Sequence, residues 1–309
     1  MNQVDVSVLI VGYGSKDLMD DCLRGLYEHT AGVEMEVLFL DCSDDGSVEL
    51  IAERFPQVRL IPNTENLGFG RGNNVLAREA RGEFVLLLNP DTLVEDNAVG
   101  RLVEFALSRP DGGVWGGLTV LPTGEIDPGC RQPAPGLRST LLRLVGRAER
   151  ANAPVTLEST EPIEVASPSG AFMMLRRETW DQLGGFDESF FMYCEETDLC
   201  YRVKQAGHKV LLDPKSRIVH LVGSGAAESP KRMLALTKGA THFNRKHFGR
   251  LFCAADHTLR WMISFTRYAA GWLALPVIGA ERGRKLRQRH ADIVFHPGSW
   301  SRGWPPQAA

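Results

Sequence analysis

Continuous apolar runs alternate with segments of helical periodicity through the first 110 residues of the chain. The apolar runs lie at residues 4–13, 35–47 with a polar exit, 58–62 and 83–88, and the helix-like segments at 15–29, 47–55 and 70–80. Runs such as VLFL (37–40) and FVLLL (84–88) lack the polar alternation of a half-exposed strand. Uninterrupted apolar strands are typical of parallel sheets that are covered on both faces. The pattern therefore predicts an α/β fold with a doubly wound, mostly parallel, Rossmann-like central sheet.

Small or acidic residues follow three of these predicted strands. They are Gly12 to Gly14, Asp41 to Asp45 and Asn89 to Asp91. In open α/β sheets, ligands bind outside the carboxyl ends of the strands. We therefore expect the three strand ends to converge on one crevice.

The second half of the chain begins with a different pattern. After residue 110 the sequence becomes rich in glycine and proline, and order returns at residues 169–214, which predict a strand, a short helix, a loop, a helix and a strand. The second of these helices is expected from Glu195 to Gln205, ended by Gly207. The chain is expected to be helical from residue 228 onward. The predicted organisation is thus an α/β domain at 1–227 and a helical, basic C-terminal region at 228–309.

The composition is that of a soluble globular protein, with 43% hydrophobic and 24% charged residues among 309. The six cysteines form no CxxC pair, and no apolar leader with a basic start opens the chain. These features favour a reducing cytoplasm, with the cysteines acting as small apolar residues of the core.

The charge is unevenly distributed. Residues 240–309 contain 11 Lys and Arg against 3 Asp and Glu, a surplus of +8 that leaves −11 for the preceding part, given a net charge of −3. Within this region the uninterrupted apolar stretch 268–280 is shorter than the roughly 20 residues of a membrane span. Beside it lies the basic segment 281–290. The pair fits a membrane surface with anionic lipids, but a helical appendage with a solvated basic end explains it equally well.

Two acidic clusters are candidates for chemistry. Asp91 at a strand end suits a divalent cation, because Mg²⁺ takes one or two carboxylates and completes its shell with phosphate and water. A simple turn is the alternative, since Asn, Pro and Asp are common turn residues.

The second acidic cluster consists of Glu195, Glu196 and Asp198, three carboxylates at a predicted helix N-terminus, where capping alone could explain them. The aromatic approach FDESFFMY (186–193) favours a general base, because an apolar pocket raises the pKa of a carboxyl group.

A histidine and two glycine motifs are further candidates for ligand binding. His220 leaves a strand toward glycines, where it could bind a metal or phosphate or simply be a surface histidine. GYGSKD (12–17) has Asp17 where a dinucleotide fingerprint needs its third glycine, and the glycines of GFGRG (68–72) have the wrong spacing. Both motifs are expected to be loops that allow a ligand close to the backbone. They argue against a nicotinamide-dependent oxidoreductase.

The order of these features resembles the family 2 glycosyltransferases of the GT-A fold. The resemblance covers about residues 5–225 and rests on VSVLIVGYGSKDLMDDCLRGL, VLFLDCSDDGS, NTENLGFGRGNNVLAREARGEFVLLLNPDT, SGAFMMLRRETWDQLGGFDESFFMYCEETDLCYRVKQAGHKV and HLVGSG. Each motif is weak alone, but together, in this order and spacing, they are specific. Within the family the chain is most similar to bacterial rhamnosyltransferases that transfer L-rhamnose from dTDP-L-rhamnose to a polyprenyl diphosphate-linked N-acetylglucosamine.

The resemblance implies a donor site in about residues 1–120 and an acceptor and catalytic part in about 121–227. It also implies roles for residues of both parts. The nucleotide-sugar would be bound by Gly12, Asp41, Asp45, Gly70, Asn74, Asn89 and Asp91, and the metal, Mg²⁺ or Mn²⁺, by Asp91 and His220. Glu196 would be the base, with Glu195 and Asp198 in the same catalytic cluster. The configuration at the sugar would invert. The expected partners are the donor, a lipid-linked sugar acceptor and a membrane surface, with no nucleic acid, which implies a cytoplasmic protein at the inner face of the cell membrane.

Three positions depart from the family pattern. Asn89 replaces the first aspartate of the family's Asp-x-Asp, Glu196 stands where aspartate is usual, and Gly14 stands where asparagine is common. Asn89 leaves a bound metal with one negative charge fewer, which makes a strict metal requirement an open question. Two alternatives also stay open: a transferase using UDP-galactose, UDP-glucose or GDP-mannose, and a non-catalytic protein that binds a nucleotide-sugar.

Overall fold

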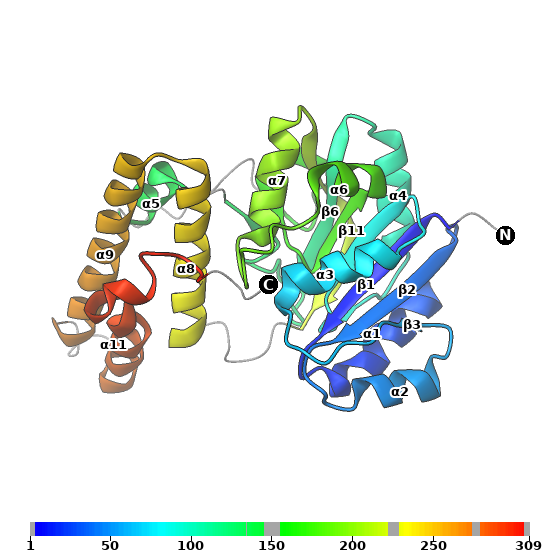
Figure 1. Ribbon diagram of the computed structural model, residues 1–309, viewed down its shortest axis with the longest axis horizontal. Helices are drawn as coiled ribbons and strands as arrows, with labels where there is room; N and C mark the ends of the chain where they lie inside the picture. The colour runs from blue at the N-terminus through cyan, green and yellow to red at the C-terminus, as the bar shows by residue number, and fades with distance from the viewer. Residues whose placement is uncertain (1–3, 134, 145–154, 222–228, 274–278, 306–309) are drawn as a thin grey trace. The chain divides into compact units, whose positions relative to one another are not determined.

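The protein is described from a computed structural model at residues 4–133, 135–144, 155–221, 229–273 and 279–305 (Figure 1). The chain divides into two compact units. The first comprises Met1–Gln132, Ala151–Asp187 and Glu196–Val222, and the second Pro133–Arg150, Glu188–Glu195 and Gly223–Ala309. The predicted boundary between residues 227 and 228 lies outside the described residues.

The first unit contains a nine-stranded sheet in the order β3-β2-β1-β4-β10-β6-β11-β5, with β8 paired to β11. The strands are β1 (Val6–Gly12), β2 (Met35–Asp41), β3 (Arg59–Leu60), β4 (Phe84–Leu88), β5 (Thr92–Leu93), β6 (Gly112–Val120), β8 (Ile163–Glu164), β10 (Phe172–Arg176) and β11 (Lys209–His220), while β7 (Arg131–Gln132) and β9 (Ser167–Pro168) form a separate ribbon. Strands β1 to β4 are parallel, and β6 is parallel to β11. Because β10 is antiparallel to both β4 and β6, all six of these strands end at one edge of the sheet.

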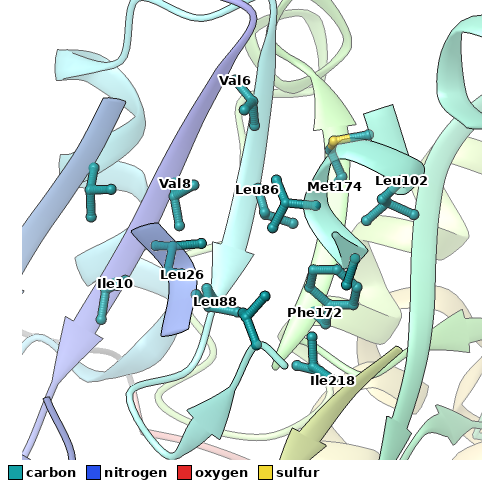
Figure 2. Packing of buried hydrophobic residues seen from close by; sticks show 14 of the residues in the cluster. Val6, Val8, Ile10, Leu26, Leu86, Leu88, Leu102, Phe172, Met174 and Ile218 are labelled. Carbon is teal, nitrogen blue, oxygen red and sulfur yellow. The ribbon is translucent and has the colours of Figure 1, made fainter. Parts of the chain in front are cut away.

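Helices cover both faces of this sheet, as its uninterrupted apolar strands require. The helices of this unit are α1 (Lys16–His29), α2 (Ser47–Arg54), α3 (Gly68–Glu79), α4 (Ala98–Ser108), α6 (Arg177–Leu183) and α7 (Glu195–Gln205). One buried cluster joins the sheet to α1, α2 and α4, and Figure 2 shows part of it, with Val8 and Leu86 from the strands near Leu26 and Leu102 from the helices. A second cluster joins the opposite face to α3, α6 and α7. The predicted doubly wound, mostly parallel sheet is confirmed.

Strand β6 is a central strand that the sequence pattern did not predict. Its nine residues, GGVWGGLTV, are almost entirely buried. The glycines are needed for close packing, because a Cβ on Gly116 would lie 2.3 Å from Pro168, and one on Gly117 would lie 2.3 Å from the ring of Phe172. A glycine-rich segment that reads as irregular is therefore a strand whose neighbours occupy the space of its side chains.

The GFGRG motif is also different from the expectation, because it forms the first turns of α3 rather than a loop. Gly72 allows this helix to approach β1, since a Cβ there would lie 2.9 Å from Val11. Close helix-to-strand packing explains why this glycine is in a helix despite its poor propensity.

The second unit is helical, which confirms the pattern expected from residue 228. It contains α5 (Leu137–Leu144), α8 (Pro230–His247), α9 (Arg250–Leu273), α11 (Ala280–Phe295) and the short 3₁₀ helix η2 (Pro297–Ser299). Asp256 on α9 is fully buried and joins three helices, because it accepts hydrogen bonds from Thr140 at 2.6 Å and Asn244 at 2.7 Å and pairs with Arg260. Among the helices of the described ranges, none combines the length and apolar character needed to cross a membrane.

Candidate active site

Asp41 ends strand β2 and is held there by hydrogen-bond donors of its own loop. The carboxylate is nearly buried and accepts from the backbone N–H of Ser43 at 3.0 Å, the Ser43 hydroxyl at 2.9 Å and the N–H of Asp45 at 3.4 Å. The same Ser43 hydroxyl accepts from the N–H of Gly14 at 2.8 Å. Because Gly12 pairs with Asp41, this bond joins the loops that follow β1 and β2.

Asp45 occupies the start of two helices. One carboxylate oxygen accepts from the N–H of Lys16 at 3.0 Å, and the other from the N–H of Ser47 at 2.9 Å. Burial would raise the pKa of Asp45, but these hydrogen bonds and the one from the Ser47 hydroxyl outweigh it and lower the pKa. The group is thus an ionised carboxylate at the N-termini of α1 and α2, where the helix dipoles stabilise negative charge.

The Asn-Pro-Asp turn follows β4 directly and is fixed through its backbone. The N–H of Asn89 donates to the carbonyl of Ala171 at 3.2 Å, and the carbonyl of Asn89 accepts from the Thr92 hydroxyl at 2.7 Å. The N–H of Leu221 donates to the carbonyl of Asp91 at 2.8 Å. The turn is therefore held between strands β10, β5 and β11, with its side chains at the edge where the parallel strands end.

His220 lies between two carboxylates at this edge. Its Nδ1 is 2.9 Å from Oδ2 of Asp127, and its Nε2 is 3.4 Å from Oδ1 of Asp91. Burial would lower the pKa of His220, but the hydrogen bonds to Asp127 and Asp91 raise it to about 9. Burial likewise would raise the pKa of Asp127, whereas the hydrogen bond from His220 and the N–H of Gly129 lower it. The structure thus brings Asp91 and His220 together, as the sequence suggested.

The donor set at Asp91 suits a divalent cation that arrives with other ligands. Among the described residues, no group of three or more histidine, cysteine, aspartate or glutamate side chains could hold a metal ion. Asp91, which is 26% exposed, offers an oxygen donor, and His220 offers a nitrogen donor once a cation displaces the proton that the two neighbouring carboxylates hold on its ring. Mg²⁺ and its relatives normally take few protein ligands at such sites and complete their shell with phosphate oxygens and water. The residues therefore fit a cation bound together with a diphosphate.

The three predicted carboxylates of α7 have different environments. Asp198 is fully buried, and its Oδ2 accepts from Nε of Arg202 at 2.8 Å. Arg202 also donates to the carbonyls of Leu183 and Gly185 at 2.8 and 2.7 Å. Asp198 therefore anchors an arginine that ties α7 to the segment after α6. Glu195 is buried and Glu196 is half-buried.

Glu196 lies close to the segment that supports the Asn-Pro-Asp turn. A methyl group placed on Gly170 would be 3.9 Å from Cβ of Glu196 and 3.1 Å from the ring of Phe69. The next residue, Ala171, accepts the hydrogen bond from Asn89. Glu196 is thus brought to the same edge as Asn89, and the ring of Phe69 lies near the same glycine.

The remaining predicted residues support the shape of this edge. The side-chain amide of Asn74 donates to the carbonyl of Phe186 and accepts from its N–H, both at 2.9 Å, which ties α3 to the segment after α6. Gly70 is buried in the first turns of α3. At Gly12 a Cβ would lie 2.7 Å from the ring of Phe39. These positions shape the site through packing and backbone contacts.

Sequence reasoning missed Ser43 and Asp127. Ser43 lies between the predicted Asp41 and Asp45, so its position in a polar strand exit was the available signal. Asp127 lies in GEIDPGC (124–130), which reads as an ordinary turn. Nothing in that stretch indicates that it would reach His220, 93 residues later in the chain.

Comparison with known sequences gives consistent matches over most of the chain. The family model described as glycosyltransferase like family 2 matches residues 3–262. A Mycobacterium tuberculosis protein named N-acetylglucosaminyl-diphospho-decaprenol L-rhamnosyltransferase is 30% identical over 270 residues, which are 82% of this chain and 85% of that protein. Rhamnosyltransferase WbbL of Escherichia coli is 23% identical over 303 residues, 94% of this chain and 100% of its own.

Two solved structures share the fold at low sequence identity. The mannosyltransferase PcManGT from Pyrobaculum calidifontis, in complex with GDP-Man and Mn²⁺, has a TM-score of 0.60 at 18% identity and covers 95% of this chain and 86% of that one. GalNAc-T7, with UDP, GalNAc and Mn²⁺, has a TM-score of 0.62 at 19% identity and covers 94% of this chain and 55% of that one.

Proposed function

Because the chain belongs to the glycosyltransferase family 2 and has the GT-A fold, we propose that this glycosyltransferase moves L-rhamnose from dTDP-L-rhamnose to a hydroxyl of a polyprenyl diphosphate-linked sugar. The convergence of Asp41, Asp91 and His220 at one sheet edge is the observation that carries transfer from a nucleotide-sugar. The choice of sugar and acceptor is supported by the relatives from Mycobacterium tuberculosis and Escherichia coli. The polyprenyl-linked acceptor corresponds to the decaprenol named for the first of them.

Asp41 and Asp45 would bind the nucleoside of the donor. Their carboxylates are oriented by backbone N–H groups and serine hydroxyls, so they can accept hydrogen bonds from a base or ribose without first reorganising. Asn74 and the glycines of α3 would shape the wall of this pocket.

Asp91 and His220 would hold a divalent cation, Mg²⁺ or Mn²⁺, together with the donor diphosphate, and Asp127 would orient the imidazole of His220. When bound, the cation supplies positive charge beside the departing diphosphate. Both solved neighbours contain Mn²⁺, which supports a divalent cation here. Asn89, in place of an acid, leaves the cation with Asp91 as its carboxylate ligand from this turn.

Glu196 would be the base of a single displacement. It would accept the proton of the acceptor hydroxyl while that oxygen attacks the anomeric carbon and the bond to the nucleoside diphosphate breaks, so the configuration inverts. Cβ of Glu196 lies near Gly170, next to the residue that receives the hydrogen bond from Asn89, which supports a role for Glu196 at this edge. Asp198 would act as a positioning residue, because it holds Arg202 and thereby the start of α7.

A donor screen tests the proposal. The purified full chain is incubated with a short polyprenyl diphosphate N-acetylglucosamine, Mg²⁺ or Mn²⁺, and dTDP-L-rhamnose, UDP-glucose, UDP-galactose or GDP-mannose in turn, and the lipid is analysed by mass spectrometry. We expect the mass to increase by one deoxyhexose with dTDP-L-rhamnose. Addition of a hexose instead would overturn the rhamnosyl assignment but keep the enzyme class. No transfer from any donor, with nucleotide binding retained in a thermal-shift assay, would favour a binding protein.

A membrane-facing surface on α9 would bring the enzyme to a lipid-linked acceptor. We define the α9 apolar face as Trp261, Met262, Phe265, Trp272 and Leu273, which recur at helical spacing and are 37% to 83% exposed. The guanidinium of Arg287 lies 3.8 Å from the ring centre of Trp272. Exposed basic residues of α11, such as Arg284 and Lys285, belong to the same unit. Aromatic side chains beside basic ones suit the interface of an anionic membrane.

Vesicle binding by the full chain tests this surface. Phe265→Ser should weaken co-sedimentation with phosphatidylglycerol vesicles, and the remaining binding should fall as salt is raised, because salt screens the basic residues. Leu107→Ser is the matched control, since Leu107 is an exposed apolar residue of α4 in the first unit. Equal binding by both variants would reject the α9 apolar face as the membrane contact.

A further inference from the structure

The segment that leads to the predicted base belongs to the helical unit rather than to the unit that carries the sheet. Residues Glu188–Glu195 group with the C-terminal helices, and the chain passes to the first unit at Glu196. We propose that the C-terminal helical unit positions the Glu195–Glu196 pair for catalysis, through Gly239, His242 and Trp304. This inference rests on the proposed function, because it assigns positioning residues to that reaction.

His242 on α8 holds the beginning of the segment. Its Nε2 lies 2.9 Å from the hydroxyl of Ser189, within hydrogen-bond distance. The ring of Phe190 packs edge-on against the same imidazole, with centroids 4.5 Å apart, and Phe190 is almost fully buried. One side chain of α8 thus fixes two consecutive residues of the segment.

Trp304, close to the C-terminal end of the described chain, holds the middle of the segment. Its indole N–H donates to the carbonyl of Met192 at 3.0 Å, and its ring packs against Phe191 at 5.6 Å between centroids. A contact between two half-buried aromatic rings together with a hydrogen bond fixes both the position and the orientation of this part of the backbone.

Gly239 on α8 contacts the end of the segment. A Cβ at this position would lie 2.3 Å from the carbonyl oxygen of Tyr193, so only glycine allows the backbone of Tyr193 to come this close. The ring of Tyr193 is in addition covered by the guanidinium of Arg232, 5.9 Å from the ring centre. The contact is made two residues before Glu195.

The backbone at this point is in an unfavourable conformation. Tyr193 and Cys194 both have positive φ angles, 65° and 71°, which side-chain-bearing residues rarely adopt. Such conformations are unfavourable and persist only where surrounding contacts impose them. The contacts described above supply that restraint directly before the first residue of α7, Glu195. A displacement of Tyr193 would therefore be passed along the chain to Glu195 and Glu196.

Two glycine-to-alanine substitutions in the same unit separate positioning from general stability. Gly239→Ala forces Tyr193 to move, whereas Gly271→Ala on α9 creates a clash of the same kind with the carbonyl of Gly283, 2.9 Å from the new methyl, and with Arg287. Both substitutions replace a helical glycine by a residue with a better helix propensity. They differ in whether the clash involves the segment before Glu195.

The two variants are compared in kcat, in donor KM and in amide hydrogen exchange of a peptide covering residues 188–195, with detergent-dispersed acceptor. We expect Gly239→Ala to lower kcat by about 10- to 100-fold, as misplacement of a reacting group by about 1 Å does, with donor KM unchanged and faster exchange in that peptide. Gly271→Ala should keep the wild-type kcat and exchange of the peptide, even if its melting temperature falls. Equal kcat in both variants, or unchanged exchange in Gly239→Ala, would overturn the proposal.

Trp304→Phe provides a conservative second test. It keeps a ring beside Phe191 but removes the donor to Met192, so the loss in kcat should be smaller than in Gly239→Ala and again without a change in donor KM. A wild-type protein that transfers no sugar would disprove the proposed function, but the exchange measurements would still decide whether these residues hold the segment. An unchanged kcat in Trp304→Phe together with accelerated exchange of residues 188–195 would show that the segment does not control catalysis.

Discussion

The two ends of strand β2 carry buried acids with opposite surroundings. Glu36, near the amino end, accepts from the Ser7 hydroxyl at 2.7 Å and pairs with Arg59 at 3.0 Å and Arg81 at 2.7 Å. Asp41, at the carboxyl end, is bound by N–H and hydroxyl groups of its own loop. One acid is paired with cations, and the other is bound by uncharged donors at the edge where the parallel strands end.

This difference indicates that the two edges of the sheet have different roles, one in the stability of the fold and the other in the reaction. Burial would raise the pKa of Glu36, but its bonds to Ser7 and the arginines lower it, so the ionised form contributes to stability. At the other end, Asp41 and Asp45 are fixed by uncharged donors, and Asp91 pairs with a histidine. Acids of the amino end should therefore affect folding, and those of the carboxyl end the reaction.

The largest effect is expected from Glu196→Gln, which removes the proposed base and keeps the shape. General base catalysis contributes about 10²–10⁴-fold, so kcat should fall by at least about 10²-fold while donor affinity and unfolding free energy stay at the wild-type level. Steady-state kinetics and calorimetric titration with donor measure the two quantities. Retained turnover would move the base to Glu195 or elsewhere, for which Glu195→Gln is the companion variant.

The next effect is expected from Asp91→Asn. The amide keeps the size of the side chain and the bond from Leu221 to the backbone carbonyl, but it loses the charge that would hold the cation. Donor affinity in the presence of Mn²⁺ should fall by about 10- to 100-fold, toward the value measured with a chelator. An affinity that is equal to wild type with and without metal would refute the role of Asp91 as a metal ligand.

Residues of this edge were predictable where they follow an apolar run directly. Asp41 ends one strand that is recognisable from sequence, Asp91 lies in the turn directly after another, and the parallel arrangement brings such ends together. Ser43 and Asp127 were not predicted, because their roles depend on partners 29 and 93 residues away in the chain. Local patterns report which element a residue ends, but not which distant side chain it will meet.

The fold shows the same limit. Strands β1, β2 and β4 follow from their own composition, whereas β6 is defined by its pairing with β10 and β11, and its glycines leave room for Pro168 and Phe172. The division at Glu196 was likewise invisible, since FDESFFMY (186–193) indicates an aromatic pocket but not that most of it packs with helices from the C-terminal region.

Glu36→Gln should destabilise the fold at the amino end of β2 without affecting the reaction at its carboxyl end. The loss of the ionised acceptor of two arginines should lower the unfolding free energy by about 1–3 kcal/mol, below the cost for a fully buried pair because both arginines are partly exposed. Since the folded-state pKa is lowered, this stability is present above the ordinary value of 4.5 and is lost as the pH falls below it. Urea unfolding at pH 7 and below pH 4 should show the gap between the variants shrinking, with kcat per folded molecule unchanged. A fall in kcat without a change in unfolding free energy would contradict the assignment of Glu36 to stability alone.

The smallest effect is expected from Ser43→Ala, and it tests whether the uncharged donors of the carboxyl end serve the ligand. The hydroxyl donates to Asp41 and accepts from Gly14, so its removal frees Asp41 to rotate and separates two loops of the proposed nucleoside pocket. One hydrogen bond of about 1 kcal/mol predicts a loss of about fivefold in dTDP affinity, with kcat at saturating donor unchanged. Ser108→Ala is the matched control, because Ser108 is an exposed residue at the end of α4 whose hydroxyl donates to the carbonyl of Phe105. Ser43→Ala could instead lower the unfolding free energy and leave dTDP affinity intact. In that case the donors around Asp41 would stabilise the fold as the arginines around Glu36 do, and both ends of β2 would serve stability.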